Sequence, residues 1–309
     1  MSIPWPHNKD FAFTIFDDTD WSTIENVSSV YALLADLGIR STKSVWTKSA
    51  VRPAKIGGST CVELDYLQWV LQLQRSGFEI AFHNATNSTS SRQETIEGLD
   101  SFRALLGHDP YSFANHTGCE ENIYWGLYRV SGLHRALYKL ATRGRPDRSS
   151  QGHLEGSPLF WGDACKSRIK YVRNFVFGGI NTLASCPFMP YHDPARPFVN
   201  YWFAGSEGPE IGSFNECLSE KNQDLLESEN GACIMYTHFA KGFYRDGKMN
   251  KRFEELLRRI SRKNGWFVPV HELLDFLLSL NGAYIVTDRQ RAQLERRWFL
   301  HKIRTGGTS

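Results

Sequence analysis

The sequence has no long apolar run, no paired cysteines and no strong charge of one sign. No stretch approaches the roughly 20 apolar residues that a membrane-spanning helix needs. The first ten residues contain two prolines and several charges instead of the apolar core of a signal peptide. We therefore expect a cytoplasmic protein without a membrane span. The formal net charge is only +3, which does not favour a nucleic-acid partner, because such proteins carry a clustered basic face.

The six cysteines lie far apart and form no CxxC pair. They are expected to be reduced thiols that pack as small hydrophobic side chains. Aromatic residues make up 13% of the chain and include nine tryptophans. Aromatic faces suit sugar rings, although most of these rings are expected in the core.

The pattern of apolar residues predicts alternating strands and helices. With 309 residues, of which 41% are hydrophobic, the chain is long enough for one large α/β barrel. Strands are expected over residues 11–16, 42–46, 78–82, 111–115, 169–177, 232–237 and 266–269. Helices are expected over residues 23–37, 64–75, 91–106, 121–140, 214–229, 253–263, 271–280 and 287–303, with polar loop over 143–157 and an irregular Pro-rich segment over 186–197. This alternation predicts parallel strands covered by helices.

Polar side chains follow several of the expected strands directly. Asp17 and Asp18 follow the first strand, His83 the third, Asn115 and His116 the fourth, and His238 a late strand. In parallel α/β folds, catalytic residues gather at the carboxyl ends of the strands. The sequence therefore predicts one site to which these side chains contribute.

The acidic pair and the first histidine each have a plain structural alternative. Asp17 and Asp18 are adjacent, so one carboxylate could bind a cation while the other accepts a proton. The alternative is a helix-capping cluster, for which Asp20 is better placed. His83 and Asn87 are four residues apart and share a face if they form a helical turn, which suits two metal ligands. A hydrogen-bonded loop histidine and a capping asparagine are the alternative.

The remaining candidates are equally ambiguous. His238 suits a general acid, because an imidazole titrates near neutral pH, but a core histidine explains it as well. Asn115 and His116 share this ambiguity. His192 and Asp193, in the segment PYHDP, could face a substrate, whereas a turn built on Asp-Pro is the plainer interpretation.

Several motifs together resemble a known family. FTIFDD (residues 13–18), FEIAFHNATN (78–87) and the late strand ending at His238 resemble the polysaccharide deacetylases of carbohydrate esterase family 4, the NodB homology domain. The resemblance extends over roughly residues 8–280. It implies a distorted (β/α) barrel that uses a divalent metal ion, usually zinc, to remove acetyl groups from sugars.

The resemblance also implies roles for individual residues. Asp17 matches the base, Asp18 and His83 match two metal ligands, and His238 matches the general acid. The second histidine of the family's His-x-x-x-His motif is replaced by Asn87, which should weaken binding of a soft metal and favour a harder ion.

Other motifs of the family are altered in this sequence. Ala114 stands where the family has an arginine that orients the base. The sequence therefore does not show which residue would keep Asp17 in its charged form. His116 is a candidate replacement for the missing nitrogen ligand. The aspartate that orients the acid has no clear match, and Asp163 and Asp193 are the two candidates.

The expected protein is therefore a barrel over residues 1–282 followed by a basic helical tail over 283–309. The expected activity is metal-dependent removal of an acetyl or other N-acyl group from a sugar or glycan intermediate, a reaction of carbohydrate metabolism. Two alternatives stay open: a deacetylase fold that binds a glycan without catalysis, and a hydrolase of another non-peptide C–N bond. The oligomeric state is open, because the arginines of the tail suit an assembly surface or a solvated face.

Overall fold

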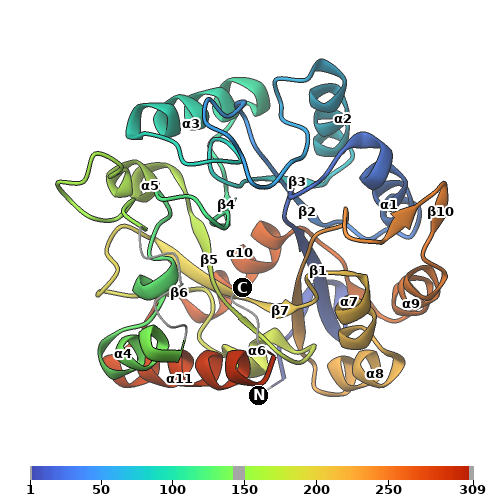
Figure 1. Cartoon of the computed structure of the whole chain (residues 1–309). Coiled ribbons are helices and arrows are strands. Elements are labelled where there is room, and N and C mark those ends of the chain that lie inside the picture. The colour runs from blue at the N-terminus through green and yellow to red at the C-terminus, as the bar shows by residue number, and fades with distance from the viewer. Residues whose placement is uncertain (1, 142–149, 306–309) are drawn as a thin grey trace.

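A closed ring of parallel strands forms the centre of the molecule (Figure 1). The structure, a computed structural model, describes residues 2–141 and 150–305. The ring consists, in spatial order, of β1 (Phe11–Asp17), β2 (Thr42–Val45), β3 (Glu79–Phe82), β4 (Ser112–Phe113), β5 (Tyr171–Phe177), β7 (Tyr201–Glu207) and β8 (Ala232–Thr237). It closes where β8 pairs with β1, in register from Ala12↔Ala232 to Asp17↔Thr237. The predicted (β/α) barrel is confirmed.

Short strands add to individual strands of the ring. β11 (Gly265–Trp266) runs parallel to the start of β1, whereas β2 pairs only with the end of β1. β6 (Tyr191–His192) is antiparallel to β7, and β12 (Tyr284–Ile285) adds to β6. β9 (Tyr244–Arg245) and β10 (Lys248–Met249) form a separate hairpin.

Helices surround the ring on its outside (Figure 1). They are α1 (Ile24–Asp36), α2 (Leu64–Arg75), α3 (Arg92–Leu106), α4 (Gly132–Ala141), α5 (Gly162–Arg168), α6 (Thr182–Ser185), α7 (Ile211–Cys217), α8 (Glu220–Ser228), α9 (Lys251–Ser261), α10 (Val270–Asn281) and α11 (Asp288–Thr305), with 3-10 turns η1 (Pro6–Asn8) and η2 (Gly126–Arg129). Local signals set their ends. Ser91 and Glu94 form a capping box at the start of α3, and Gly107 ends it with φ 84°.

The core lies in the ring and between the ring and the helices. β1, β5 and β8 are buried along their whole length, as expected of parallel strands covered on both faces. Inside the barrel, the centres of the phenyl groups of Phe16 and Phe203 lie 6.0 Å apart. The first helix buries Val27, Val30 and Leu34 at the spacing of a single helical face.

The structure differs from the predicted elements in several places, of which three concern long segments. The predicted helix over 121–140 begins only at Gly132, because Tyr124 (φ 47°) and Gly126 (φ 57°) adopt left-handed conformations that no α-helix accommodates. The predicted helix over 214–229 consists of α7 and α8. The barrel strand β7 was not predicted at all. The predicted loop over 143–157 lies partly outside the described residues, which resume at Ser150.

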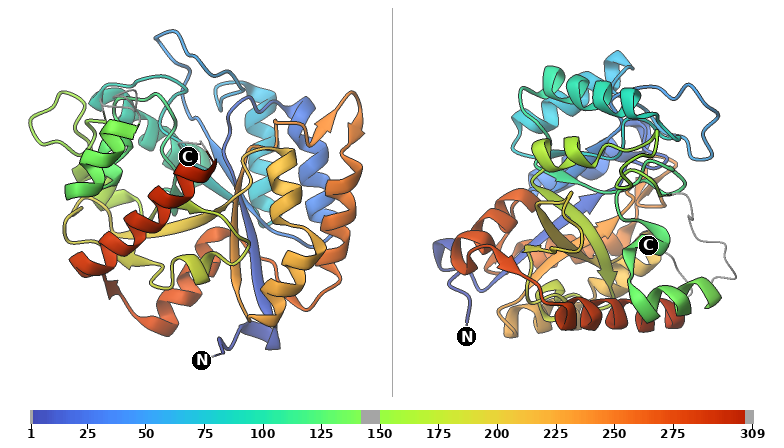
Figure 2. Two further views of the ribbon diagram at one scale, coloured as in Figure 1. Left: turned by 60° about the horizontal axis from the view of Figure 1, so that its bottom comes forward. Right: turned by 90° about the vertical axis from the view of Figure 1, so that its left-hand side faces the viewer.

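The C-terminal helix α11 packs against the barrel and does not stand free. It contacts β5 and lies next to α4 (Figure 2). Trp298 is fully buried at this contact, and burial of a large apolar side chain stabilises a fold by roughly 1.5–3 kcal/mol. Arg291 donates to Asp193 at 2.9 Å, and Lys302 donates to Glu207 at 2.8 Å. The proposed domain boundary near residue 282 stays a prediction. None of the helices in the described residues is long and apolar enough to cross a membrane.

Candidate metal centre and active site

Side chains from the carboxyl ends of β1, β3, β4, β5 and β8 line one pocket. The lining residues are Asp18, Asp20, His83, Asn115, Thr117, Trp125, Arg173, Val176, Tyr236 and His238. All of them except Thr117 are buried. Segments far apart in the sequence thus supply polar side chains to one enclosed volume, at the end of the barrel where catalytic sites of such folds are found.

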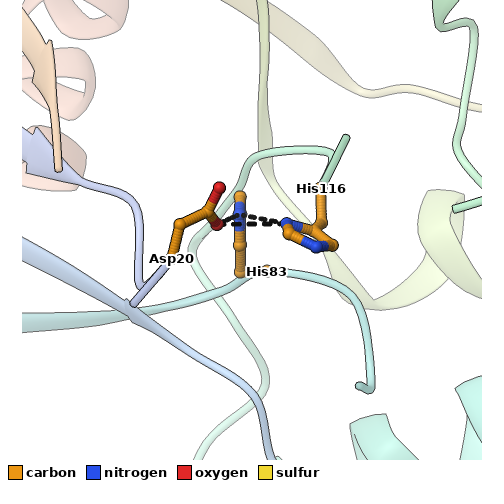
Figure 3. A group of neighbouring side chains, drawn as sticks. All are labelled: Asp20, His83 and His116. Atoms are coloured by element: carbon orange, nitrogen blue, oxygen red, sulfur yellow. Dashed lines mark hydrogen bonds and ion pairs between the residues drawn. The ribbon is translucent and has the colours of Figure 1, made fainter. Parts of the chain in front are cut away.

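Asp20, His83 and His116 point toward one another at the base of this site (Figure 3). Oδ1 of Asp20 lies 3.1 Å from Nε2 of His83 and 3.1 Å from Nδ1 of His116. The two ring nitrogens lie 3.3 Å apart. Each side chain therefore offers one ligand atom to a common point, and all three residues are buried.

The tautomer of His83 shows that this point suits a cation. Nδ1 of His83 lies 2.8 Å from the carbonyl oxygen of Ala114, and a carbonyl only accepts, so Nδ1 carries the hydrogen. In the neutral ring, Nε2 then presents a lone pair to the carboxylate of Asp20. Two acceptors facing each other repel unless a proton or a metal ion lies between them. A carbonyl that fixes the tautomer of a ligand histidine is a common support of metal sites.

The spacing of the three ligand atoms fits a small divalent ion. Tetrahedral ligands held at about 2.0–2.1 Å from zinc are separated from one another by roughly 3.3 Å. The separations of 3.1, 3.1 and 3.3 Å lie close to that value. Two imidazoles and one carboxylate are also a donor set found in catalytic zinc sites. The residues present therefore fit such an ion.

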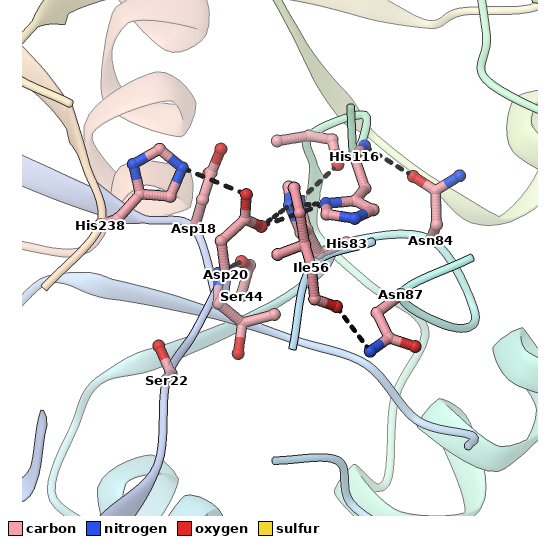
Figure 4. Close-up of polar contacts among 12 residues, drawn as sticks. Asp18, Asp20, Ser22, Ser44, Ile56, His83, Asn84, Asn87, His116 and His238 are labelled. Carbon is pink, nitrogen blue, oxygen red and sulfur yellow. Dashed lines mark hydrogen bonds and ion pairs between the residues drawn. The ribbon is translucent and has the colours of Figure 1, made fainter. Parts of the chain in front are cut away.

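The charge of Asp20 is stabilised by its neighbours. Burial raises its pKa, but the neighbouring His116, His238 and His83 outweigh burial and hold the pKa well below its usual range. The second carboxylate oxygen, Oδ2, lies 3.4 Å from Nε2 of His238. Asp20 thus remains an anion and links the two histidines of the group to the histidine after β8 (Figure 4).

Asp18 lies beside this group and is held by an arginine. Nη1 and Nη2 of Arg173 donate to Oδ1 and Oδ2 of Asp18 at 2.8 and 2.6 Å. The guanidinium lies 4.9 Å from the ring centre of Phe16 and 4.4 Å from that of Tyr236. Burial raises the pKa of Asp18, but the charge and hydrogen bonds of Arg173 outweigh burial and leave the pKa below its usual value, so the carboxylate stays charged. Arg173, on β5, therefore supplies the positive charge that Ala114 cannot.

A backbone carbonyl fixes the orientation of His238. Nδ1 of His238 donates to the carbonyl oxygen of Pro209 at 2.8 Å, so Nε2 faces the pocket. Nε2 lies 3.4 Å from Asp20 and 3.5 Å from the hydroxyl of Tyr236. No carboxylate of the described residues contacts Nδ1 in the way that the resemblance implies, because the carbonyl of Pro209 occupies that position.

Asp17, the predicted base, does not line the pocket. Its Oδ2 accepts from Tyr31 at 3.0 Å and from Lys43 at 2.9 Å, and its Oδ1 accepts from the backbone N–H of Phe239 at 2.8 Å. The side chain is fully buried. Three donors hold its two oxygens, and Asp17 ties the end of β1 to the residue that follows His238, a placement that does not support the predicted role of base.

Asn87, the predicted second ligand of the histidine motif, also lies elsewhere (Figure 4). Its Nδ2 donates to the carbonyl oxygen of Ile56 at 2.9 Å, and it does not belong to the group of converging ligand atoms. The segment after β3 is a loop and not a helical turn, so the spacing of four residues does not place His83 and Asn87 on one face. His116 takes the third position instead.

Asparagine side chains hold the loop that carries His116. Oδ1 of Asn84 accepts from the backbone N–H of His116 at 2.9 Å, and Nδ2 of Asn122 donates to its carbonyl oxygen at 2.7 Å. Nδ2 of Asn84 also donates to Asn122 at 3.0 Å and to Glu121 at 2.8 Å. Asn115 pairs with both backbone groups of Ile123, at 2.8 and 3.0 Å.

Three predicted supporting residues lie outside the pocket. Asp163 pairs with Arg92 at the surface, with contacts of 2.6 and 2.7 Å. Nδ1 of His192 donates to the carbonyl oxygen of Asn200 at 3.0 Å. Asp193 is fully buried and pairs with Arg196 and Arg291 beneath α11. These side chains make their contacts within the scaffold, a placement that does not support the predicted contact with substrate.

Asp20 and Arg173 are the residues that the sequence analysis missed. Asp20 was interpreted as a helix cap, but Thr23 caps α1 and its N–H donates to Asn26 at 2.8 Å. The spacing of Asp18 and Asp20 was the available signal, because every second residue of an extended chain points the same way. For Arg173, the signal was a charge inside the apolar run YVRNFVF, since a buried charge needs a partner.

Comparison with known proteins identifies the fold through structure alone. No family model matches the chain, and no curated protein matches its sequence. Among solved structures, a protein described as a polysaccharide deacetylase from Mycobacterium smegmatis has a TM-score of 0.54 at 10% identity, covering 93% of this chain and 96% of that chain. One described as a polysaccharide deacetylase from Pseudomonas aeruginosa PAO1 has a TM-score of 0.54 at 10% identity, covering 91% and 95%. PuuE allantoinase has a TM-score of 0.53 at 12% identity, covering 91% and 94%.

These similarities extend over almost the whole chain on both sides. At identities of 10–12% they establish the fold and not the activity. The chain therefore has the fold of the polysaccharide deacetylases, as the motifs predict, with only 10–12% sequence identity to these structures.

Proposed function

We propose that this protein is a metal-dependent hydrolase that removes an acetyl or similar N-acyl group from a sugar-derived substrate. The observation that carries the proposal is the convergence of Asp20, His83 and His116 beside the ion pair of Asp18 and Arg173. A fold shared with polysaccharide deacetylases supports the choice of reaction.

Asp20, His83 and His116 would hold the metal ion, with zinc as the proposed ion. Two imidazoles and a carboxylate leave an open position for a water molecule or a substrate carbonyl. When bound, such an ion polarises the acyl carbonyl and lowers the pKa of a bound water. This ligand set replaces the expected set of Asp18, His83 and Asn87.

Asp18 is the proposed general base. Its carboxylate is kept charged by Arg173 and lines the pocket next to the metal group. It accepts one proton of the attacking water, while the water oxygen forms a bond to the acyl carbon. Arg173 holds both carboxylate oxygens, so the direction of the carboxylate is fixed before the substrate arrives.

His238 is the proposed general acid. The carbonyl of Pro209 holds its Nδ1–H, so a proton on Nε2 is directed into the pocket. As the C–N bond breaks, His238 passes this proton to the leaving nitrogen, which departs as an amine. The products are a carboxylic acid and a free amine. The oxygen of the new C–O bond comes from the water, and the proton that Asp18 accepts from it balances the proton that His238 gives to the nitrogen.

Metal content and hydrolysis of the purified protein test this proposal. We expect about one zinc ion per chain by elemental analysis, and either release of acetate and amine from N-acetylglucosamine or ring opening of a small cyclic amide. His116→Ala should lose the metal and the activity. Asn87→Ala is the matched control, because Asn87 bonds only to a loop carbonyl, and it should retain both. Retention of zinc in His116→Ala together with its loss in Asn87→Ala would contradict the proposed ligand set.

A further inference from the structure

The helix α4 exposes an apolar stripe of the kind that a surface helix normally buries. Leu133, Leu137 and Leu140 are spaced by four and three residues, so they lie on one face of the helix. In a globular protein such a stripe packs onto the core. Here Leu133 is 73% exposed, Leu137 41% and Leu140 77%, so α4 presents leucines to solvent from its start to its end.

A different face of α4 attaches the helix to the molecule. Tyr138 is buried, and its ring centre lies 5.4 Å from that of Trp298 on α11. At the start of α4, Ser131 donates to Glu295 of α11 at 3.0 Å, and Nδ1 of His134 lies 3.2 Å from the same carboxylate. These contacts hold α4 in place without its leucines, so packing within the described residues does not explain the exposed stripe.

The neighbouring helix α11 exposes apolar side chains as well. It lies beside α4 and contacts it (Figure 2). Leu300 and Ile303, about one turn apart near the end of α11, are 44% and 61% exposed. Single exposed apolar residues are ordinary on a protein surface, whereas a group of them on adjoining elements marks a binding surface.

The charges of these two helices are mostly positive. α4 and α11 together contain eight basic and two acidic residues, whereas the whole chain has 36 basic and 33 acidic residues. Of the two acidic side chains, Glu295 is fully buried and Asp288 pairs with Arg291 at 2.9 Å. Arg296 and Arg304 of α11 are exposed. A partner that is both apolar and anionic therefore complements these helices.

The surface of an anionic lipid bilayer has both properties. Helices that lie in a membrane interface insert leucines among the acyl chains, while lysine and arginine side chains contact the anionic headgroups. A second copy of this chain would bring two basic surfaces together, and like charges across an interface repel. Single-stranded nucleic acid is bound through aromatic side chains that stack on the bases, and the exposed stripe of α4 has leucines instead.

We infer that α4, together with the end of α11, docks on the surface of a membrane that contains anionic lipids. The leucines of α4 enter the boundary between headgroups and acyl chains, and Leu300 and Ile303 extend the contact. The basic side chains of both helices face the phosphate groups. The protein lies on the bilayer and does not cross it.

Sedimentation with lipid vesicles tests the inference. The full chain is mixed with vesicles of phosphatidylcholine, and with vesicles of phosphatidylcholine and phosphatidylglycerol. We expect binding to the anionic vesicles, weakened by salt, and much weaker binding to the neutral ones. The double variant Leu133→Gln, Leu140→Gln should bind the anionic vesicles about 100-fold more weakly, because each buried leucine contributes on the order of tenfold. Arg296→Gln should weaken binding by about fivefold.

A matched control is available on another helix. Leu225 of α8 is 44% exposed, so Leu225→Gln makes the same chemical change away from α4 and α11 and should bind vesicles as the wild type does. Glutamine has nearly the helix propensity of leucine, so all of these variants should keep the wild-type urea midpoint.

Three results would overturn the inference. The first is no binding of the wild type to anionic vesicles. The second is equal binding by the wild type and the folded double leucine variant. The third is a dimer of the wild type that the double variant abolishes, without vesicle binding, which would assign the surface to a second copy. None of these measurements uses hydrolysis, so their failure and the failure of the proposed function are distinguishable.

Discussion

Glu121 should make the stability of the protein depend on pH. Its carboxyl group is fully buried next to the asparagines that hold His116, and Oε1 accepts from Asn84 at 2.8 Å. Among the described residues, Oε2 has no hydrogen-bond partner. Burial, the main cause, raises the pKa of Glu121 to about 7. An unfolded glutamate titrates near 4.3, so between these values the folded protein binds more protons than the unfolded chain.

The sign and size of the effect follow from this difference. The folded state is favoured while Glu121 is protonated, and stability falls as pH rises toward the folded pKa. Each pH unit in that window changes the free energy of unfolding by up to about 1.4 kcal/mol. Between pH 5.5 and pH 8, the wild type should therefore lose roughly 2 kcal/mol that Glu121→Gln does not lose.

Urea denaturation of the two proteins at several pH values measures the effect. Both are treated with a chelator, so that a metal ion at His116 does not contribute. The difference in unfolding free energy between variant and wild type cancels the titration of all other groups. We expect this difference to grow in favour of Glu121→Gln from pH 5.5 to pH 8. A difference that stays constant over this range would refute the account of a buried, half-bonded carboxyl group.

Two further predictions separate structural from chemical roles. Asp18→Asn should lose about 10²–10⁴-fold in kcat, the usual range for a general base, yet bind zinc, whereas Asp17→Asn should not show that loss of kcat. Both variants should lower the urea midpoint, because each leaves a buried cation, Arg173 or Lys43, without its anion. Asn84→Ala should weaken zinc binding by about 10–100-fold, the usual effect of losing a residue that orients a ligand. Calorimetry measures this affinity, and a wild-type zinc affinity in Asn84→Ala would show that His116 needs no such support.

Much of the barrel could be predicted because its signals are local. Apolar runs ended by glycine mark most of the strand and helix pairs, and Gly107 indeed ends α3 in a left-handed conformation. β7 gave a weaker signal, since it follows a Pro-rich segment and contains Ala204 and Gly205, residues with low strand propensity. Its place between β5 and β8 depends on pairing with strands far away in the sequence.

The sequence predicted where the site lies better than it predicted what each residue does there. The rule that chemistry follows strand ends correctly selected Asp18, His83 and His238 as neighbours in one pocket. The sequence predicted Asp17 as the base and Asp18 as a metal ligand, whereas the proposed base is Asp18 and the proposed ligand is Asp20. The difference arises because adjacent residues of an extended chain point to opposite sides. Asp17 therefore points toward Lys43, whereas the next residue points into the pocket. No local signal shows that an arginine 155 residues away reaches Asp18.

The position of β1 in the ring has a consequence for synthesis of the chain. Along most of its length β1 pairs with β8, and at its start with β11, and both of these neighbours lie more than 200 residues downstream, whereas β2 pairs only with its last two residues. Ribosomes add about 5–20 residues per second, so the first strand waits on the order of 10–40 seconds for its partners. During that time a strand of seven mostly apolar residues has a bare backbone edge, to which a second nascent chain or a chaperone can bind.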